Sequence, residues 1–341
     1  MNILQTADEA SQYNRKKKLI ELKNVKKHYI QKPSLLERLI TKQKERVIHA
    51  VDDISLVIYS GETLGLVGES GCGKSTLGRT IIKLHEPTSG EIIYEDMNLN
   101  KIRGQELKKF RQKAQIIFQN PYSSLNPRKT VREILRIALL GRGVSNYLEQ
   151  EKELRVLVDK VGLSARHLDN YPHQFSGGQR QRIGIARALA MNPEFIVADE
   201  PVSALDVSVQ AQIIKLLKEL QREMSLTYLF ITHDLSVVHY VSDRIAVMYL
   251  GRLVELAETK KLFQNPKHPY TQALLSSIPT IHKEKRRQRI ILQGSVSTPL
   301  EAPKGCSFYN RCAERIHGVC DKVPPLWQEK DNHWVACHLY Q

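Results

Sequence analysis

The stretch from Gly68 to Thr76, GESGCGKST, combines residue types that bind phosphate groups. It matches the pattern G-x-x-x-x-G-K-S/T, in which glycines let successive backbone N–H groups point at one phosphate. Lys74 is predicted to reach the β- and γ-phosphates, and the Ser75 hydroxyl to bind Mg²⁺. Cys72 stands at a variable position, where we expect a small filler and not a reactive thiol. The candidate phosphate-binding residues are Gly68, Ser70, Gly71, Gly73, Lys74, Ser75 and Thr76.

Two acidic residues end a short apolar run, FIVADEP, from Phe195 to Pro201. Asp199 lies at the predicted end of a buried strand, where a carboxylate can hold Mg²⁺ through water. Glu200 follows it and can orient and deprotonate an attacking water. A phosphate loop and this acidic pair in one chain predict hydrolysis of the nucleotide and not only its binding.

Other polar residues also follow apolar strands. Gln119, in IIFQNP, is a candidate sensor of the γ-phosphate or Mg²⁺, and His233, in LFITHD, is a candidate hydrogen-bond donor to the γ-phosphate. The segment SALD, which ends at Asp206, comes directly after the acidic pair. Each residue taken singly is typical of an ordinary polar group at a strand end. Their order along the chain favours a shared site.

A second glycine-containing stretch, PHQFSGGQRQRIGIARAL, runs from Pro172 to Leu189 and opens a predicted helix. Helix N-termini attract anions because backbone N–H groups and the helix dipole both point at the ligand. This stretch has no lysine at the usual position, although the chain already has a complete phosphate loop. The candidate residues are Ser176, Gly177, Gly178 and Gln179.

The elements that must position these residues alternate between strands and helices. Alternating apolar and polar residues around turns predict strands in the first hundred residues, and apolar residues three and four apart predict helices later. This succession predicts an α/β fold with a parallel sheet covered on both faces. Residues 31–46 are expected to form an exposed insertion between two strands. Strands are predicted near 20–25, 54–68, 91–94, 195–199 and 226–232, and helices near 131–163 and 208–224.

The chain carries a net charge of +15 and its basic residues are unevenly placed. They gather between Arg15 and Arg46 and again at 283–289. Such charge suits nucleic acid, an anionic membrane surface or nucleotide phosphates, and equally suits two solvated faces. No apolar run approaches the roughly 18 residues of a membrane-spanning helix, and no signal-peptide core is present, so the expected compartment is the cytosol.

Four of the five cysteines lie in the last 36 residues. A cytosolic chain seldom keeps disulfides, so this group indicates metal binding. The tight C-x₂₋₄-C pair typical of structural zinc is absent, whereas thiolate-rich sites also suit iron–sulfur clusters. Zinc and free or oxidised thiols remain alternatives. His317, His333 and His338 nearby are expected to be exposed. The four cysteines are Cys306, Cys312, Cys320 and Cys337.

The order of these motifs resembles that of the ATP-binding cassette (ABC) ATPases. The phosphate loop is followed by Gln119, FSGGQ at 175–179, ADE at 198–200, SALD at 203–206 and His233, a set that spans most of residues 19–255. Phe175 stands where leucine is commoner. The resemblance implies a P-loop NTPase fold with a mixed or parallel sheet core, an antiparallel β subdomain and an α-helical subdomain. The implied domains are a flexible basic 1–18, a cassette at 19–262 with helices at about 121–180, and a small cysteine-containing extension at 263–341.

The resemblance also explains the second glycine stretch. In this family the segment that corresponds to FSGGQ at 175–179 is called the signature. The signature of one cassette faces ATP held by the phosphate loop of a second cassette. Ser176, Gly177, Gly178 and Gln179 would then contact a neighbour's γ-phosphate, with Asp206 also near the nucleotide. Tyr29, in VKKHYIQK, is the candidate that stacks on adenine. The implied cofactors are ATP and Mg²⁺.

A finer resemblance is to the ATPase subunits of dipeptide and oligopeptide importers. It rests on FQNPYSSLNPR at 118–128, EPVSALDVSVQAQI at 200–213, NPKHPYTQALLSSIP at 265–279 and the tail GCSFYNRC. It implies a related or identical second ATPase subunit, two membrane-spanning permease subunits that dock at about 121–175, and indirectly an extracellular or periplasmic substrate-binding protein. The chain would lie peripherally on the cytoplasmic face of the membrane and bind no nucleic acid. Some members of the subfamily bind a 4Fe-4S cluster through cysteines in this tail.

Two other readings of the motifs remain. An importer of nickel or another small solute would carry the same ATPase chemistry. A DNA-repair ATPase would explain the positive charge, but those proteins insert a long coiled coil between phosphate loop and signature. Only about a hundred residues separate Lys74 from Ser176, without sustained heptads.

Overall fold

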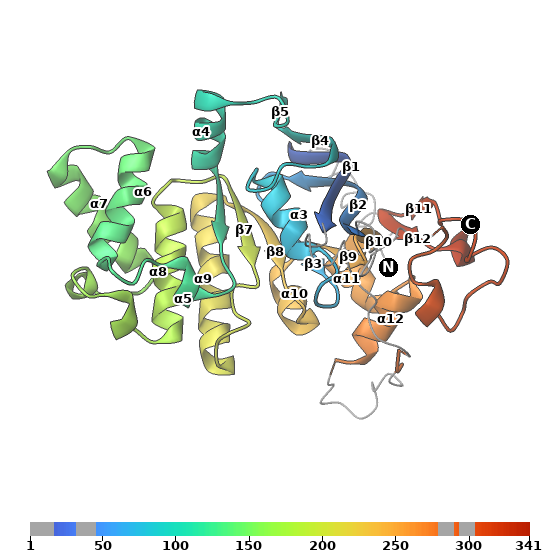
Figure 1. The fold of residues 1–341 in the computed structure, drawn as a ribbon. Helices are drawn as coiled ribbons and strands as arrows, with labels where there is room; N and C mark the ends of the chain where they lie inside the picture. The colour runs from blue at the N-terminus through green and yellow to red at the C-terminus, as the bar shows by residue number, and fades with distance from the viewer. Residues whose placement is uncertain (1–16, 32–45, 279–289, 293–303) are drawn as a thin grey trace, which may run out of the picture. The chain divides into compact units, whose positions relative to one another are not determined.

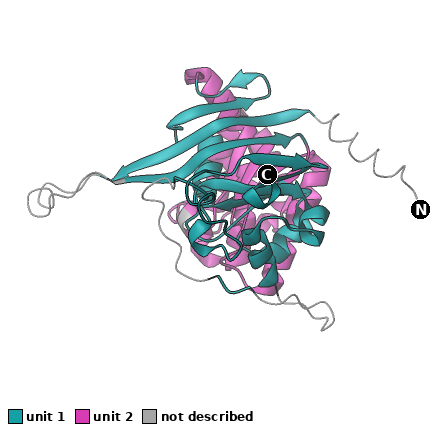
Figure 2. Cartoon of the chain, turned by 90° about the vertical axis from the view of Figure 1, so that its right-hand side faces the viewer, with its two compact units in different colours: residues 1–60, 64–100, 233–341 teal, residues 61–63, 101–232 magenta. Residues whose placement is uncertain are grey.

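The computed structural model describes residues 17–31, 46–278, 290–292 and 304–341. These residues form two compact units, which Figure 2 distinguishes by colour. Unit 1 comprises residues 1–60, 64–100 and 233–341, and unit 2 comprises 61–63 and 101–232. Three segments discussed above lie wholly or mostly outside the described residues. They are the predicted insertion at 31–46, the basic run at 283–289 and the N-terminal segment.

Unit 1 contains an antiparallel sheet with strand order β2-β1-β4-β5. Alternate residues of its long strands, such as Ile20, Leu22, Leu56 and Ile58, are buried, and the residues between them are more exposed. This period of two produces a sheet with one apolar face. The antiparallel β subdomain is therefore confirmed. The strands are β1 (Lys18–Gln31), β2 (Arg46–Tyr59), β4 (Ser89–Tyr94) and β5 (Met97–Asn98).

A second group of strands in unit 1 has the order β11-β12-β10-β9-β3. Strand β3 (Thr63–Val67) pairs in parallel with β9 (Arg244–Tyr249), and both are fully buried. The other pairs are antiparallel, and they join the C-terminal strands to the cassette. These strands are β10 (Arg252–Glu258), β11 (Trp327–Lys330) and β12 (His333–Ala336), and the helices of unit 1 are α3 (Lys74–Ile81), α10 (Leu235–Val241), α11 (Thr259–Gln264) and α12 (Pro269–Ser276).

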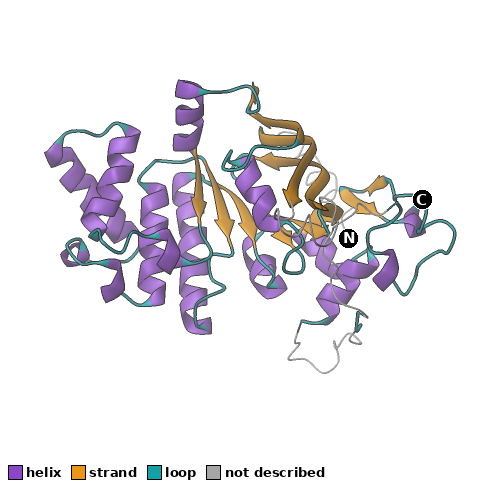
Figure 3. Cartoon of the chain, viewed as in Figure 1, coloured by secondary structure: helices purple, strands orange, loops and turns teal. Residues whose placement is uncertain are grey.

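Unit 2 contains three strands in the order β8-β7-β6, all parallel. Figures 1 and 3 show helices packed along these strands, as the apolar strand sequences require. The predicted helix at 208–224 is confirmed, and the predicted stretch at 131–163 is two helices separated by a Gly143 cap. The elements are α4 (Gly104–Lys113), β6 (Ala114–Ile117), α5 (Pro121–Ser124), α6 (Val131–Arg142), α7 (Tyr147–Lys160), α8 (Gly177–Leu189), β7 (Phe195–Asp199), α9 (Val207–Met224) and β8 (Thr227–Ile231).

One expectation for the C-terminal segment was wrong. His333 is buried and its Nε2 lies 2.6 Å from the Glu255 Oε1, whereas His317 is exposed and His338 is half-buried. Glu255 is itself fully buried and also accepts hydrogen bonds from the backbone N–H groups of Lys267 and His268. His333 is buried because β12 adds to the sheet beside β10 and brings it to this carboxylate. None of the described helices is both long enough and apolar enough to cross a membrane.

Candidate functional site

The phosphate loop follows β3 and leads into α3, as its sequence predicts. Gly73 caps the helix with φ of 106°, a left-handed conformation that favours glycine. A Cβ at Gly73 would lie 1.9 Å from the Ala50 carbonyl oxygen, and one at Gly68 would lie 2.1 Å from the Met248 carbonyl oxygen. Glycine is therefore needed at both positions, because the loop backbone passes directly over neighbouring backbone.

The Lys74 side chain lies inside the loop. Its Nζ donates to the carbonyl oxygens of Gly68 at 2.7 Å and Glu69 at 2.9 Å, and the residue is only 4% exposed. The loop thus holds the ammonium group at the N-terminus of α3, where anions bind favourably. Cys72 is buried, and burial raises the pKa of its thiol, which agrees with the expected filler.

The acidic pair lies at the end of β7 in unit 2. Asp199 is fully buried, and the backbone N–H of Glu200 donates to the Ile231 carbonyl oxygen at 3.0 Å. Glu200 has φ of 49°, which is rare for a residue with a side chain and is common at functional sites. The Gln119 Nε2 donates to the Glu200 Oε2 at 2.7 Å. The structure thus brings together two of the predicted catalytic residues.

The glycine-rich signature begins α8. Ser176 is its N-cap: its hydroxyl accepts the Gln179 N–H at 3.3 Å, and the Gln179 side-chain oxygen accepts the Ser176 N–H at 3.0 Å. A Cβ at Gly178 would lie 2.4 Å from the Val209 side chain, so the first turn of α8 packs tightly against α9. A capped N-terminus with an exposed serine can receive an anion from outside the chain.

The remaining predicted residues lie at element ends. Tyr29 is half-buried near the end of β1, with its ring 6.1 Å from that of His85. His233 is exposed just before α10. Asp206 is the N-cap of α9 but makes no side-chain capping hydrogen bond. The phosphate loop, Tyr29, His233 and the four tail cysteines belong to unit 1, and Gln119, Asp199, Glu200, Ser176–Gln179 and Asp206 belong to unit 2.

The four tail cysteines are all free thiols. Cys312, Cys320 and Cys337 are buried, and Cys306 is half-buried, with its N–H donating to the Cys320 carbonyl oxygen at 2.7 Å. Burial, with smaller contributions from the charges of the other three cysteines, raises the pKa of the Cys337 thiol to about 11. Burial likewise raises the pKa of Cys306 to about 11, with contributions from Cys320 and Cys312.

The described thiols do not form a group as close as a single metal ion would require. Four thiolates on one zinc ion at about 2.3 Å would lie within about 4 Å of one another. Among the described residues, no three cysteine sulfurs lie within 4.8 Å of one another. In a cluster each thiolate binds a different iron, which spaces the sulfurs more widely. The one group within that limit in the described part of the chain is His28, His49 and Asp52, whose carboxylate already binds Arg252.

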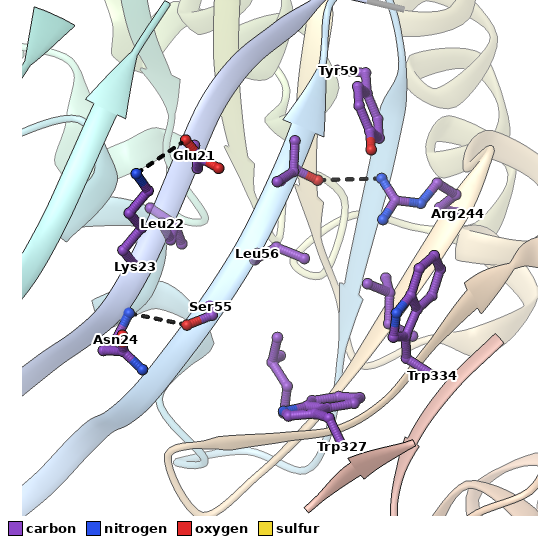
Figure 4. Close-up of a pocket in the computed structure, with 13 residues that line it drawn as sticks. Glu21, Leu22, Lys23, Asn24, Ser55, Leu56, Tyr59, Arg244, Trp327 and Trp334 are labelled. Atoms are coloured by element: carbon purple, nitrogen blue, oxygen red, sulfur yellow. Dashed lines mark hydrogen bonds and ion pairs between the residues drawn. The ribbon is translucent and has the colours of Figure 1, made fainter. Parts of the chain in front are cut away.

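A cavity of about 440 Å³ lies elsewhere in unit 1 (Figure 4). Both tryptophans of the chain, Trp327 and Trp334, line it together with Tyr59 and Arg244. Arg244 donates to the Val57 carbonyl oxygen at 3.2 Å, and its guanidinium lies 5.2 Å from the Tyr59 ring centroid. None of the predicted site residues lines this cavity.

Comparison with known proteins identifies the family. The family model described as ABC transporter matches residues 51–203, and a second, described as the C-terminal region of oligopeptide/dipeptide transporters, matches 254–320. The oligopeptide transport ATP-binding protein AppF of Bacillus subtilis is 48% identical over 94% of this chain and 97% of its own length. The chain is an ABC transporter ATPase. The dipeptide transport ATP-binding protein DppF of Escherichia coli is also 48% identical, over 94% of this chain and 93% of its own.

Solved structures of ABC ATPases share the fold. A dimeric post-hydrolysis state of the ATP-binding cassette MJ0796, bound to ADP and Pi, is 32% identical with a TM-score of 0.61 over 71% of this chain and 99% of that one. The cbiO1 protein of Clostridium perfringens, part of the cbiONQ transporter complex, is 26% identical with a TM-score of 0.60 over 73% and 92%. The P-loop fold expected from the motifs is thus confirmed. As an ABC ATPase, the chain uses ATP and Mg²⁺.

Proposed function

We propose that this ATPase powers the import of dipeptides or oligopeptides through separate membrane-spanning subunits. The observation that carries the proposal is the presence, in one chain, of the ABC transporter match and the oligopeptide/dipeptide C-terminal region. Relatives named as peptide transport proteins match nearly the whole chain. We assign residues 19–262 to the cassette and 263–341 to the extension.

The phosphate loop of the chain binds ATP. Its backbone N–H groups and Lys74 bind the β- and γ-phosphates, and Ser75, Gln119 and Asp199 bind Mg²⁺ directly or through water. Tyr29 stacks on adenine, where an aromatic face gives affinity with little base specificity. The remaining residues assigned to nucleotide contact are Gly68, Ser70, Gly71, Gly73, Thr76 and Asp206.

Hydrolysis depends on Glu200 as the general base that orients and deprotonates the attacking water. The Gln119 hydrogen bond at 2.7 Å supports this role, because it fixes the carboxylate from the neighbouring parallel strand. His233 donates a hydrogen bond to the γ-phosphate. Negative charge that develops on the phosphoryl oxygens is stabilised by Lys74 and Mg²⁺.

Each site is completed by a second cassette. Ser176, Gly177, Gly178 and Gln179 present a hydroxyl, N–H groups and a helix N-terminus to the γ-phosphate of ATP on the neighbour. ATP then stabilises the closed dimer, and loss of the γ-phosphate removes those contacts and releases it. The second cassette is a copy of this chain or a related subunit.

Transport requires further partners. Two membrane-spanning permease subunits dock on the helical segment at about 121–175, and a substrate-binding protein outside the membrane delivers the peptide to them. The chain is peripheral on the cytoplasmic face of the membrane. Because the chain binds ATP and not the cargo, peptide selectivity belongs to these other subunits.

The proposed function predicts which proteins copurify with the chain. A tagged copy isolated from membranes in mild detergent is expected to bring down two permeases and a second cassette. In vesicles containing that assembly together with the substrate-binding protein, peptide is expected to raise the ATPase rate and to cross the membrane only when ATP is supplied. Stimulation by a nickel chelate and not by peptides would replace peptide import with the small-solute alternative. Salt-sensitive binding to DNA without membrane partners would instead support the DNA-repair reading.

We further propose that Cys306, Cys312, Cys320 and Cys337 bind a 4Fe-4S cluster. The support is the chain's four tail thiols, three of them buried, together with the resemblance of this tail to that of peptide-importer ATPases. Such a cluster would hold together a tail too short to build its own core.

Iron analysis tests the cluster proposal. Full-length protein purified without oxygen is expected to be brown and to contain about four irons and four sulfides per chain. Cys312→Ser is expected to lose most of this iron, whereas Cys72→Ser keeps it because Cys72 lies in the phosphate loop. Stoichiometric zinc, or no metal in the anaerobic protein, would contradict the proposal.

A further inference from the structure

One residue of the phosphate loop is bound directly by the C-terminal segment. The Arg311 Nη1 donates to the Glu69 Oε2 at 2.6 Å, and its Nη2 donates to the Glu69 Oε1 at 3.0 Å. The two residues are 242 positions apart in the sequence, and both lie in unit 1. A guanidinium bound to a carboxylate through two parallel hydrogen bonds is among the strongest side-chain pairs, and it fixes orientation as well as distance.

The pair is shielded from solvent. The Arg311 side chain is 9% exposed and the Glu69 side chain 24%, so water screens their attraction less than it screens a surface ion pair. The Arg311 guanidinium also lies 5.9 Å from the centroid of the Tyr249 ring. Its hydrogen bonds to the Glu69 carboxylate raise the pKa of Arg311, so the guanidinium keeps its charge throughout the physiological range.

The backbone of the same loop residue has a second anchor. The Glu69 N–H donates to the Tyr270 hydroxyl at 2.8 Å, and Tyr270 is fully buried in α12. The Glu69 carbonyl oxygen in turn accepts from the Lys74 Nζ at 2.9 Å. Glu69 is thus held through its side chain and its N–H by the extension, and through its carbonyl by the phosphate-binding lysine.

Arg311 and Tyr270 are the two anchors of the loop. They adjoin a core shared with the segment that carries Cys306 and Cys312, which we call the cysteine segment. The ring of Phe308, between Cys306 and Cys312, lies 5.4 Å from that of Tyr270 and 5.2 Å from that of Tyr249. Cys312 belongs to the same buried cluster, and so does Val67, the last residue of β3 before the loop. Movement of the cysteine segment would therefore displace both anchors of the loop, since close-packed cores transmit strain.

The charges explain why this loop needs Arg311. A carboxylate inside a loop that receives a polyphosphate repels that ligand unless a cation neutralises it. Arg311 supplies the neutralising charge from outside the loop, which leaves Lys74 available to the phosphates. Arg311 therefore lowers the electrostatic cost of binding ATP, and Tyr270 keeps the backbone N–H of Glu69 in a fixed direction.

We propose that the C-terminal extension holds the phosphate loop of its own chain in its ATP-binding conformation, with Arg311 and Tyr270 as the positioning residues. The extension is thereby part of the ATP site and not only an addition to the cassette. This inference rests on the proposed binding of ATP by Gly68–Thr76. It implies that the affinity of the chain for ATP, measured without any peptide, depends on whether the cysteine segment is folded.

Neutralising Arg311 tests the proposal in the full-length protein. Arg311→Met keeps an unbranched side chain in place of the arginine stem, removes the guanidinium and leaves the Glu69 carboxylate without its partner. Its affinity for Mg-ATP, measured with a fluorescent analogue, is expected to fall on the order of ten-fold, the usual size for a lost hydrogen-bonded charge pair. The KM for ATP is expected to rise similarly, with kcat at saturating ATP within about two-fold of wild type, because Arg311 touches no reacting atom.

A second substitution separates charge from general damage. In the double variant Glu69→Gln with Arg311→Met the unpaired carboxylate is gone, so most of the ATP affinity is expected to return. Damage to the fold alone would not be repaired by a second substitution. Tyr270→Phe, which removes one hydroxyl, is expected to weaken ATP binding about three-fold. Arg315→Met is the matched control, since Arg315 lies four residues on and its guanidinium faces the Tyr309 ring.

The outcomes distinguish this inference from the proposed function. If wild type binds ATP and Arg311→Met binds it equally well, or if the double variant stays as weak as Arg311→Met, the extension does not position the loop. If wild type itself binds no ATP, the proposed function fails first. Equal weakening in Arg315→Met would show that any loss of basic charge in this segment has the effect, and would also overturn the inference.

Discussion

Replacing Glu200 with glutamine is expected to leave ATP binding intact and to slow hydrolysis by a factor on the order of 10²–10⁴, the usual contribution of a general base. Glutamine keeps the size of the side chain and can still bind Gln119, whose Nε2 lies 2.7 Å from the carboxylate. It cannot accept a proton from water. The main change is therefore chemical, and the measurement is steady-state phosphate release at saturating Mg-ATP.

The same variant tests whether ATP stabilises the closed dimer. Without hydrolysis, the γ-phosphate contacts persist, so Glu200→Gln is expected to accumulate as a dimer of cassettes in size-exclusion chromatography with ATP. Glu219→Gln, on an exposed part of α9 where it pairs with Lys215, is the matched control and is expected to hydrolyse ATP normally. Continued turnover in Glu200→Gln would remove Glu200 from its role as the base.

The local parts of this site could be predicted from the sequence. The pattern at Gly68–Thr76 specifies its own loop, because Lys74 binds carbonyl oxygens no more than six residues away and the glycines supply backbone angles that other residues rarely adopt. Likewise, the short apolar run FIVAD favours a buried strand, so its acids are expected at the carboxyl end of that strand, as found for Asp199 in β7. Where a short window contains the whole physical cause, the prediction holds.

Contacts that depend on strand register could not be predicted. His333 was expected at the surface because nothing near it in sequence shows that β12 pairs with β10, where the Glu255 carboxylate lies. The Arg311–Glu69 pair is similar, since its two residues are 242 positions apart. In both cases the position of the residue is set by a charged partner that is distant in the sequence. The local pattern of apolar and polar residues contains no information about such a partner.

The signature presents the sharpest test of a shared ATP site, because its serine has a structural role that can be kept while its proposed functional role is removed. Ser176 caps α8 by accepting the Gln179 N–H. Aspartate caps helices as well as serine and interacts favourably with the helix dipole, whereas loss of the cap costs about 1 kcal/mol. The melting temperature of Ser176→Asp is therefore expected to equal that of the wild-type protein.

Its effect on catalysis is expected to be large, because the new carboxylate would face the γ-phosphate held by the neighbouring cassette. Each chain should still bind ATP through its own Lys74, but ATP-driven dimerisation in the Glu200→Gln background and hydrolysis by the assembled transporter should fall to background. Ser164→Asp adds the same charge at an exposed residue before a short helical turn and is expected to have neither effect. If Ser176→Asp protein still dimerises with ATP and hydrolyses it at the normal rate, the signature does not contact a neighbour's nucleotide, and each chain must complete its site alone.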